Sequence, residues 1–312
     1  MQLPAISVVV STRDRGASIG RTIETLLASD YPCFEVRIID QSADLRTEAA
    51  VRPFLGDPRV RYERTSVRGL SIGRNVGIAG AQGELIAITD DDCDVPPDWL
   101  REMADAFAID DRIGLVFGNV RAAPYDPKAG FTIGYVRTEP FLARSIGDKH
   151  RAEGISGNMG IRKSVWTALD GFDVMLGAGA RFESAGETDL AIRVLLAGSF
   201  VYETPRLTVV HKGFRSWDEG LPQIQRYLYG IGAMLAKNLK LGHASILLLM
   251  FRLAWRWAFQ RPSVDYGFRP PKGLRLAAFF RGLTAGALAR VDRTTGHFAA
   301  ASTAAGMIGS GR

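Results

Sequence analysis

The chain has 312 residues, of which 46% are hydrophobic and 23% are charged. This composition is typical of a folded globular protein and excludes a wholly disordered chain, a collagen-like chain and a short disulfide scaffold. The net charge of +6 is unevenly distributed, because residues 1–204 carry a net charge of −6 and residues 205–312 one of +12. Such a division predicts an acidic body with a basic segment that faces an anionic surface, either membrane lipid or nucleic acid.

Cysteine content and apolar runs bear on where the protein works. Cys33 and Cys93 are too few for a disulfide framework and do not form a metal-binding pair, which favours a reducing compartment. The N-terminus has no basic stretch before its apolar run, so we expect it to be a buried strand and not a signal peptide. The longest uncharged apolar run, residues 241–251, is shorter than the ~20 residues that span a bilayer. We therefore expect no segment to cross a membrane unaided.

The first part of the chain alternates apolar runs with segments of helical periodicity. The runs lie at 6–10, 36–39, 60–62 and 85–89, and the helical segments follow near 19–27, 44–54, 70–81 and 97–107. Continuous apolar strands that alternate with amphipathic helices predict an α/β fold with a mostly parallel sheet covered on both faces. Ligands of such sheets bind beyond the carboxyl ends of the strands. The residues that follow each strand are therefore the candidates for function.

The rest of the chain is less regular. We predict a strand at 113–122, a long functional loop at 126–151, and short strands at 155–161, 200–202 and 207–210 around a helix at 188–197. Three apolar and basic helices are predicted at about 221–239, 244–259 and 273–291. Small residues dominate 294–312, which we expect to be a disordered tail.

Four carboxylates follow the predicted strand at 85–89, namely Asp90, Asp91, Asp92 and Asp94. Clustered carboxylates repel one another and raise one another's pKa unless a cation neutralises them. Hard oxygen ligands on a short loop suit Mg²⁺ or Mn²⁺ better than Zn²⁺. An EF-hand counted from Asp90 fails, because Val95 and Arg101 stand where a Gly and a Glu are needed. An aspartyl phosphatase remains a weak alternative.

A second group of polar residues lies at the ends of other predicted strands. Thr12, Arg13 and Asp14 follow the first strand, Asp40 follows the second, and Arg74 opens the helix before the fourth. A carboxylate at a strand end accepts hydrogen bonds from a base or a ribose, and an arginine pairs with phosphate. The group predicts a nucleotide pocket.

A third group, around residues 183–193, contains the candidate general base. Glu187 and Asp189 fall in the first turn of a predicted helix, where the helix dipole also favours carboxylates for structural reasons. Near a bound divalent ion, either carboxylate could deprotonate an acceptor hydroxyl. His211 ends a later strand, and a lone histidine is more often structural than a metal ligand.

Together these motifs resemble the family 2 glycosyltransferases of the GT-A fold, over about residues 5–215. By that resemblance Ser11-Thr-Arg-Asp-Arg15 is the nucleotide-contacting loop, Asp40 contacts the nucleobase and Arg74 approaches the diphosphate. Thr89-Asp-Asp-Asp92 matches the Asp-x-Asp element, which places Asp90 toward the ribose, Asp91 with the donor-binding residues and Asp92 on the metal.

The resemblance also suggests roles in the second half of the chain. Gly186-Glu-Thr-Asp-Leu190 matches the acidic motif of the family, in which Glu187 is the base when aligned on Asp189, with Gly186 replacing the usual first acid. His211 matches a histidine that completes the metal shell with Asp92 and Asp90 in some related enzymes. Gly157-Asn-Met-Gly-Ile-Arg162 and Gly171-Phe-Asp173 resemble segments that line the sugar and acceptor side.

The resemblance implies an inverting transfer of a sugar from a nucleotide-diphosphate donor to a hydroxyl of a glycan or lipid-linked acceptor, with Mg²⁺ or Mn²⁺ as cofactor. We expect a GT-A domain at 1–215, a helical, basic, membrane-proximal segment at 216–293 and the tail at 294–312. The basic helices contain arginine, aromatic and aliphatic residues but no acid, which is typical of an anionic membrane interface.

We therefore expect a cytoplasmic protein, peripherally bound to the inner face of the cell membrane, that binds no nucleic acid. Three alternatives stay open. The basic helices could pack on the body instead of on lipid. The chain could be an inactive module that binds sugar nucleotides. A nucleic-acid-binding protein is less favoured, because the basic residues are interleaved with aliphatic side chains.

Overall fold

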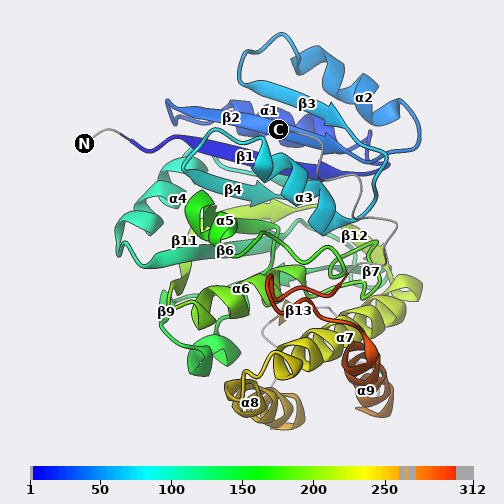
Figure 1. The fold of residues 1–312 in the computed structure, drawn as a ribbon. Helices are drawn as coiled ribbons and strands as arrows, with labels where there is room; N and C mark the ends of the chain where they lie inside the picture. Colours follow the sequence, from blue (N-terminus) through cyan, green and yellow to red (C-terminus); the bar gives the residue numbers. More distant parts are fainter. Residues whose placement is uncertain (1–2, 260–263, 266–271, 300–312) are drawn as a thin grey trace.

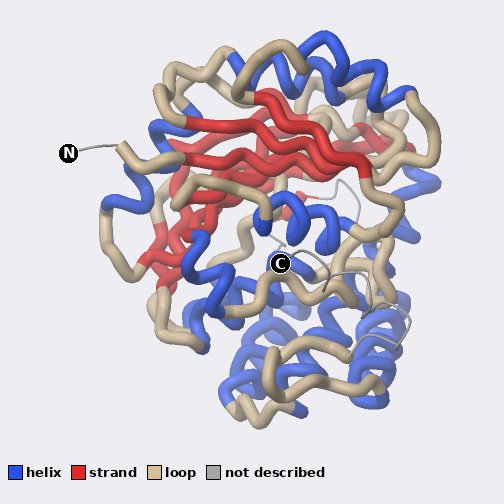
Figure 2. The backbone as a smooth tube through the Cα atoms, turned by 45° about the horizontal axis from the view of Figure 1, so that its top comes forward, coloured by secondary structure: helices blue, strands red, loops and turns tan. Residues whose placement is uncertain are grey.

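The computed structural model describes residues 3–259, 264–265 and 272–299. A large mixed sheet lies between layers of helices, and three C-terminal helices extend from one end of the molecule (Figures 1 and 2). The strands of the large sheet are β1 (Ile6–Thr12), β2 (Phe34–Asp40), β3 (Val60–Arg64), β4 (Leu85–Thr89), β5 (Cys93–Asp94), β6 (Ile113–Ala122), β8 (Gly134–Tyr135), β9 (Phe141–Ala143), β10 (Asn158–Arg162), β11 (Phe200–His211) and β13 (Val264–Asp265). A separate pair of strands consists of β7 (Gly130–Thr132) and β12 (Phe214–Ser216).

The helices of the body connect these strands. They are α1 (Ile19–Leu27), α2 (Arg46–Val51), η1 (Arg52–Phe54), α3 (Leu70–Ala79), α4 (Trp99–Ala108), η2 (Ile146–Arg151), α5 (Lys163–Ala168) and α6 (Gly186–Leu196). The C-terminal helices are α7 (Trp217–Lys240), α8 (Ser245–Phe259) and α9 (Lys272–Leu288). Helix α7 begins with a capping box, in which Ser216 and Glu219 each bond the backbone of the other.

The sheet has the strand order β13-β8-β6-β10-β4-β1-β2-β3, and β11 pairs with β6 in parallel. Strands β4, β1, β2 and β3 run parallel, as the alternation of strands and helices predicts. Strand β10 is antiparallel to both β4 and β6. The parallel strands therefore deliver their carboxyl ends, with the polar residues that follow them, to one edge of the sheet.

Strand β1 shows why its central residues, Val8 to Val10, are all apolar. Val8 and Val10 pack in one core with Ile23 of α1, while Val9 packs in a second core on the opposite face with Ile78 of α3. Successive side chains of a strand point to opposite faces, so a strand covered by helices on both sides needs apolar residues at every position.

Some predicted elements differ from the structure. The two strands predicted at 200–202 and 207–210 are one strand, β11, with an irregular register between Thr204 and Thr208. The segment predicted as a long loop, 126–151, contains β7, β8, β9 and η2. These short elements carry little periodicity of their own and are held by pairing with β12, β6 and β11, which a local sequence pattern does not reveal.

The predicted disordered tail is partly wrong. Residues 294–299 are described, and Phe298 is buried against Phe182 with ring centroids 4.3 Å apart. Val291 pairs with Phe298 in an isolated β-bridge. One aromatic side chain in an otherwise small-residue segment is enough to anchor it in the core. Residues 300–312 lie outside the described part of the chain.

The C-terminal helices share a core with the body. Leu176, Phe182 and Ile192 of the body pack with residues of α7, α8 and α9. Helices α7 and α9 approach closely through glycines: a Cβ at Gly282 would lie 1.9 Å from the carbonyl oxygen of Tyr229. Among the residues described, no helix combines the length and hydrophobicity needed to cross a membrane.

We predict that Gly282→Ala lowers the free energy of unfolding by about 1–3 kcal/mol, because the new methyl group would overlap backbone atoms of α7 that cannot rotate away. The measurement is chemical denaturation followed by circular dichroism. Gly273→Ala in the same helix is the control, since a methyl group there would have no described atom within 4 Å. Equal stability of the two variants would contradict the close packing of α7 on α9.

Candidate active site

A cavity of about 270 Å³ opens at the carboxyl ends of β1 and β4. It is lined by Ser11, Thr12, Arg13 and Arg15 after β1, by Gln41 after β2, by Gly69 and Leu70 at the start of α3, by Asp90, Asp91 and Asp92 after β4, by Ala178 and Gly179, and by His211 and Arg215 near the end of β11. Six of the predicted site residues therefore face one cavity, namely Thr12, Arg13, Asp90, Asp91, Asp92 and His211.

Three of these residues form a group with the chemistry of a metal site. Ligand atoms of Asp90, Asp92 and His211 all lie within 4.8 Å of one another. His211 reaches this position because β11 pairs antiparallel with β5, which sets His211 opposite Cys93. The Nδ1 atom of His211 lies 2.9 Å from the carbonyl oxygen of Ile133, so Nδ1 carries the proton that is donated and Nε2 faces Asp92 Oδ1 at 3.3 Å.

The carboxylate and the imidazole stabilise each other's charged forms. Burial raises the pKa of Asp92, but the hydrogen bond and the charge of His211 outweigh burial, and the pKa of Asp92 is lowered overall. Burial likewise opposes the charge of His211, and its pKa is nevertheless raised by Asp92 and Asp90. The two carboxylates therefore favour a positive charge beside them, either the proton of His211 or a metal ion that displaces that proton.

Asp91 lies in a different electrostatic position. Burial, together with the charges of Asp92 and Asp90, raises the pKa of Asp91 to about 7. The positive charge of Arg15 lowers the pKa of Asp91 but only partly offsets this rise. Crowding of like charges adds to the effect of burial, as the sequence predicts for this cluster.

Arginines oppose this acidic edge. Arg15 Nη1 lies 3.7 Å from Asp92 Oδ2, and Arg13 and Arg215 also line the cavity. Gly213 permits the close packing, because a Cβ there would lie 2.4 Å from His211 Nε2 and 2.8 Å from Asp92 Oδ2. A cavity that holds guanidinium groups beside clustered carboxylates suits a ligand with both phosphate groups and a bound cation.

Sequence reasoning missed several residues of the cavity. Gln41 lies one position beyond Asp40, and Ala178, Gly179 and Arg215 join the cavity only through the tertiary fold, whereas Arg15 and Ser11 belong to the predicted nucleotide-contacting loop. Ser11 Oγ is buried without a hydrogen-bond partner among the described residues, and Ser11 lines the cavity. An orphaned hydroxyl at a cavity wall is expected to bond a ligand.

Three residues predicted to contact the nucleotide do not line the cavity. Asp40 is fully buried, where Oδ1 accepts from the Ser42 amide at 2.8 Å and Oδ2 accepts from the Tyr62 hydroxyl at 2.7 Å. The Asp14 carboxylate instead accepts from the Ala43 amide at 3.3 Å, and the Asp14 amide donates to Ser42 Oγ at 2.7 Å. Arg74 is buried and pairs with Asp90 at 3.3 Å, so it acts on the cavity through that carboxylate.

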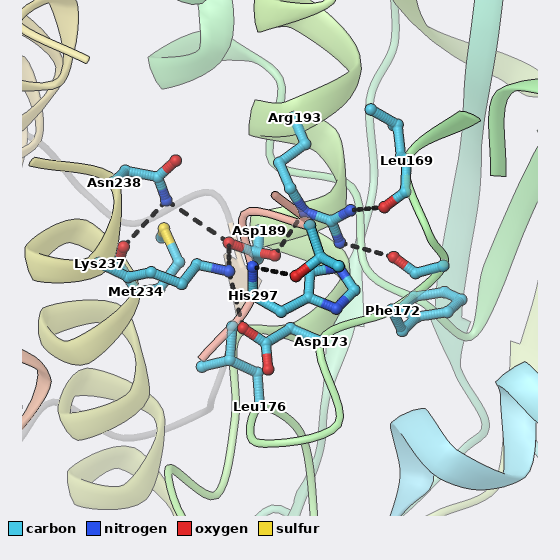
Figure 3. A network of polar contacts seen from close by, with 12 residues as sticks. Leu169, Phe172, Asp173, Leu176, Asp189, Arg193, Met234, Lys237, Asn238 and His297 are labelled. Carbon is cyan, nitrogen blue, oxygen red and sulfur yellow. Dashed lines mark hydrogen bonds and ion pairs between the residues drawn. The ribbon is translucent and has the colours of Figure 1, made fainter. Parts of the chain in front are cut away.

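The structure separates the two candidate bases. Asp189 has no exposed surface, and its carboxylate pairs with Lys237 at 2.8 Å and Arg193 at 2.9 Å (Figure 3). Burial raises its pKa but these two cations lower it more, so Asp189 stays ionised and sealed from any acceptor. This geometry argues against the prediction of Asp189 as a base.

Glu187 is half-buried at the start of α6, and its carboxylate forms no ion pair or hydrogen bond with the other described residues. Gly186, directly before it, lies against Ser71, and the neighbouring Leu70 lines the cavity. Glu187 is thus the carboxylate of this motif that forms no ion pair with a described residue. It lies beside the cavity but is not part of the cavity lining.

The segments expected to line the acceptor side have structural roles. Asn158 is fully buried and bonds Trp99, Asn119 and Leu207. Asp173 is fully buried next to Lys237. Gly157 does approach the site, since a Cβ there would lie 3.2 Å from Asp90 Oδ2.

Comparison with known proteins agrees with this geometry. Residues 7–167 match the family described as glycosyl transferase family 2. The succinoglycan biosynthesis protein ExoO of Rhizobium meliloti (strain 1021) is 37% identical over 105 residues, which cover 33% of this chain and 29% of that protein. The beta-monoglucosyldiacylglycerol synthase of Synechocystis sp. (strain ATCC 27184 / PCC 6803 / Kazusa) is 30% identical over 115 residues, which cover 34% of this chain and 23% of that protein.

The chain thus spans less than a third of the length of these two curated relatives. Among solved structures, the mannosyltransferase PcManGT from Pyrobaculum calidifontis, in complex with GDP-Man and Mn²⁺, superposes with a TM-score of 0.58 and 17% identity. The match covers 92% of this chain and 88% of that chain, and at this identity it shows the fold alone. The fold class predicted from the sequence is confirmed, and the chain belongs to glycosyltransferase family 2 and has the GT-A fold.

Proposed function

We propose that the protein transfers a sugar from a nucleotide-diphosphate donor to a hydroxyl of a glycan or lipid-linked acceptor, with the help of Mg²⁺ or Mn²⁺ and with inversion at the anomeric carbon. The cavity at the ends of β1 and β4 carries this proposal. It combines a carboxylate and imidazole cluster with arginines, which together fit a diphosphate and its cation. GT-A membership supports a nucleotide-sugar donor.

The residues present fit a divalent cation. Asp90, Asp92 and His211 offer two carboxylates and a neutral imidazole nitrogen, a donor set that suits Mn²⁺ and Mg²⁺. The hydrogen bond from His211 Nδ1 to Ile133 holds the ring with Nε2 toward Asp92. When bound there, the cation would offset the negative charge of the departing diphosphate.

The arginines supply the protein's own share of that charge compensation. Arg13, Arg15 and Arg215 face the cavity, where guanidinium groups pair with phosphate oxygens in a fixed geometry. Arg74 holds Asp90 from its buried position and keeps the carboxylate oriented. Positively charged groups that are in place before the reaction stabilise a leaving group without reorganisation.

Glu187 is the proposed general base. Its carboxylate is free of ion pairs among the described residues and stands at the start of α6, next to the α3 residues that border the cavity. A single base that activates the acceptor hydroxyl leads to direct displacement, in which the acceptor attacks opposite the leaving diphosphate. Direct displacement inverts the anomeric configuration.

We predict that Asp92→Asn lowers transfer at least about 100-fold, because charge on the leaving diphosphate would lose its compensation. Transfer is measured with a radiolabelled or mass-resolved donor, and folding by thermal melting. Asp94→Asn is the matched control, since Asp94 lies two residues further along the chain, in β5, and outside the cavity lining. Transfer by Asp92→Asn at the wild-type rate would remove the metal assignment.

We predict that Glu187→Gln lowers kcat about 100-fold or more and leaves the affinity for nucleoside diphosphate unchanged, because the amide cannot accept the proton. Steady-state kinetics and calorimetry measure the two quantities. Glu24→Gln on α1 controls for the loss of one surface charge, and an unchanged kcat in Glu187→Gln would assign the base elsewhere.

A second cavity suits the acceptor. It has a volume of about 310 Å³ and lies between the segment before α6 and helices α7 and α9, where Arg181, Arg226, Tyr229 and Arg281 line it together with Glu183. Arg226 pairs with Glu183 at 3.5 Å, which leaves a net positive lining. Such a lining favours an acceptor with a phosphate or carboxylate group. The relative from Synechocystis is named for synthesis of a glycolipid, which supports a lipid-linked acceptor.

The C-terminal helices provide a surface for membrane lipid. Leu247, Phe251 and Trp255 of α8 follow one another at helical spacing and are 60%, 66% and 54% exposed. Leu276 and Phe280 of α9 are also exposed, and both helices lie at the end of the molecule away from α2 (Figure 1). Exposed aromatic and aliphatic side chains on helices that lack acidic residues are typical of interfacial helices.

We propose peripheral attachment to the inner face of the cell membrane. The +12 charge of residues 205–312 suits the anionic lipids of a cytoplasmic leaflet. Both cysteines are free, which accords with a reducing compartment. Packing on the body and contact with lipid involve different faces of these helices. The inner face of α8, where Ile246 and Leu249 are buried, packs on the protein.

We predict that replacing Phe251 and Trp255 together by Ser weakens binding to phosphatidylglycerol vesicles about tenfold or more, because two aromatic side chains would no longer enter the interface. Vesicle co-sedimentation at low salt measures the binding. Leu55→Ser, which removes an exposed leucine directly after η1 in the body, is the control. Failure of the wild-type protein to bind anionic vesicles would contradict attachment, and capture of an oligonucleotide instead would favour nucleic acid.

A further inference from the structure

Among the described residues, the largest group of buried charges lies outside both cavities, where α6 meets α7. Asp173, Asp189 and Lys237 have no exposed surface, and Arg193 is 6% exposed. The Lys237 ammonium donates to Asp173 Oδ2 and to Asp189 Oδ1, each at 2.8 Å (Figure 3). Two cations and two anions balance, as burial of charge requires.

The carboxylates of Asp173 and Asp189 lie on either side of one loop. Residues 173–186, named here the base loop, begin at Asp173 and lead into α6, which carries Glu187 and Asp189 in its first turn. Asp173 Oδ1 accepts from the amide of Met175 as the loop begins. A single ammonium group from α7 thus binds both the first residue of the base loop and the first turn of the helix that follows the loop.

The base loop connects the donor cavity to Glu187. Ala178 and Gly179 line the cavity, and the Ala178 carbonyl accepts from the Leu70 amide at 2.9 Å. Gly177, Gly179, Glu183 and Ala185 all have positive φ, so the loop has a conformation that costs energy at its non-glycine positions. Hydrogen bonds within the loop, such as those from the Gly177 amide to Ser184 and from the Phe182 amide to Met175, hold its shape. Contacts outside the loop fix where that shape lies relative to the cavity.

Neighbouring contacts close the group off from water. Arg193 donates to the carbonyls of Leu169 and Gly171, both at 2.8 Å, and thereby holds the segment before Asp173. The Phe298 amide donates to Asp173 Oδ2 at 2.8 Å, and the Phe298 ring lies over Lys237 with 5.5 Å between Nζ and the ring centroid. The C-terminal segment therefore covers the group, and the ion pairs act in a dry environment.

We propose that Lys237 is a positioning residue of the transfer reaction. By binding Asp173 and Asp189, Lys237 ties the start of the base loop to the first turn of α6 and thereby directs Glu187 toward the acceptor hydroxyl. The inference rests on the proposed role of Glu187 as the base. Lys237 touches neither donor nor acceptor, and its effect passes through the position of α6 and of the loop. Small misplacements of a catalytic group have large effects on rate.

The test needs variants that remain folded. Lys237→Met alone leaves two buried carboxylates with one arginine, which is strongly destabilising. The double variant Lys237→Met with Asp173→Asn keeps a neutral group, because Arg193 still balances Asp189, but it removes the link between the loop ends. Lys240→Met on the same helix is the matched control, since within the described part of the chain its ammonium bonds only the carbonyls of Ala287 and Ala289.

Thermal melting, calorimetry with nucleoside diphosphate and Mn²⁺, and steady-state transfer are measured on all variants. We expect the double variant to melt cooperatively, to bind the nucleotide within about threefold of wild type, and to lose about tenfold or more in kcat. Lys240→Met is expected to keep its kcat. A folded double variant whose kcat stays within about threefold of wild type overturns the inference.

Two further arms separate the possible failures. If the double variant does not fold, the isosteric Asp173→Asn variant decides on the same two quantities: a lower kcat with unchanged nucleotide affinity supports the inference, and an unchanged kcat overturns it. Glu187→Gln is measured in parallel. If Glu187→Gln transfers at the wild-type rate, the proposed base is wrong; if Glu187 is needed and the Lys237 link is not, the positioning role alone fails.

Discussion

The three carboxylates that follow β4 set the main constraint on this structure, because the segment that carries them cannot neutralise them. Their counter-charges arrive from remote parts of the chain: Arg15 follows β1, Arg74 belongs to α3, and His211 ends β11. The parallel strands place the first two groups at the correct edge of the sheet, and the pairing of β11 with β5 places the third. The topology of the sheet therefore determines which positive groups balance the charge of the carboxylates at the site.

Two clusters of carboxylates in the molecule are stabilised in two different ways. Beside the cavity, the negative charges of Asp90 and Asp92 are only partly balanced by protein cations, so the site can bind a metal cation and, with it, a diphosphate. Between α6 and α7, Asp173 and Asp189 are fully compensated by Lys237 and Arg193 and are closed off by Phe298. The first arrangement suits exchange of ligands, and the second suits a fixed framework.

Sequence patterns predict the parts of the molecule that depend on local information. The strands β1 to β4, the helices between them and the cluster after β4 follow from apolar runs and from residues at strand ends. The position of Asp40 at the end of β2 suggests contact with a nucleobase, yet the hydroxyl of Tyr62 on the neighbouring strand occupies its carboxylate. Nothing in the local sequence around Asp40 shows that Tyr62 will reach it.

The parts that could not be predicted depend on contacts between distant segments. Lys237 lies on a helix whose basic residues indicate a lipid or phosphate surface, and only the tertiary fold shows that this lysine is buried between Asp173 and Asp189. Residues 294–299 lack a periodic pattern, but the Phe298 side chain and amide anchor them. Arg215 joins the cavity through the path of the chain after β11.

The central claim is that the cavity at the ends of β1 and β4 binds a nucleotide-diphosphate sugar together with a divalent cation. Its most direct test is thermal melting of the wild-type protein with UDP-, GDP- and dTDP-sugars, each with Mn²⁺ and with EDTA, alongside an assay for released nucleoside diphosphate. The account predicts that one nucleotide class stabilises the protein in Mn²⁺ and that EDTA abolishes the stabilisation. If no nucleotide sugar stabilises the protein or is hydrolysed with any divalent metal, the claim is contradicted.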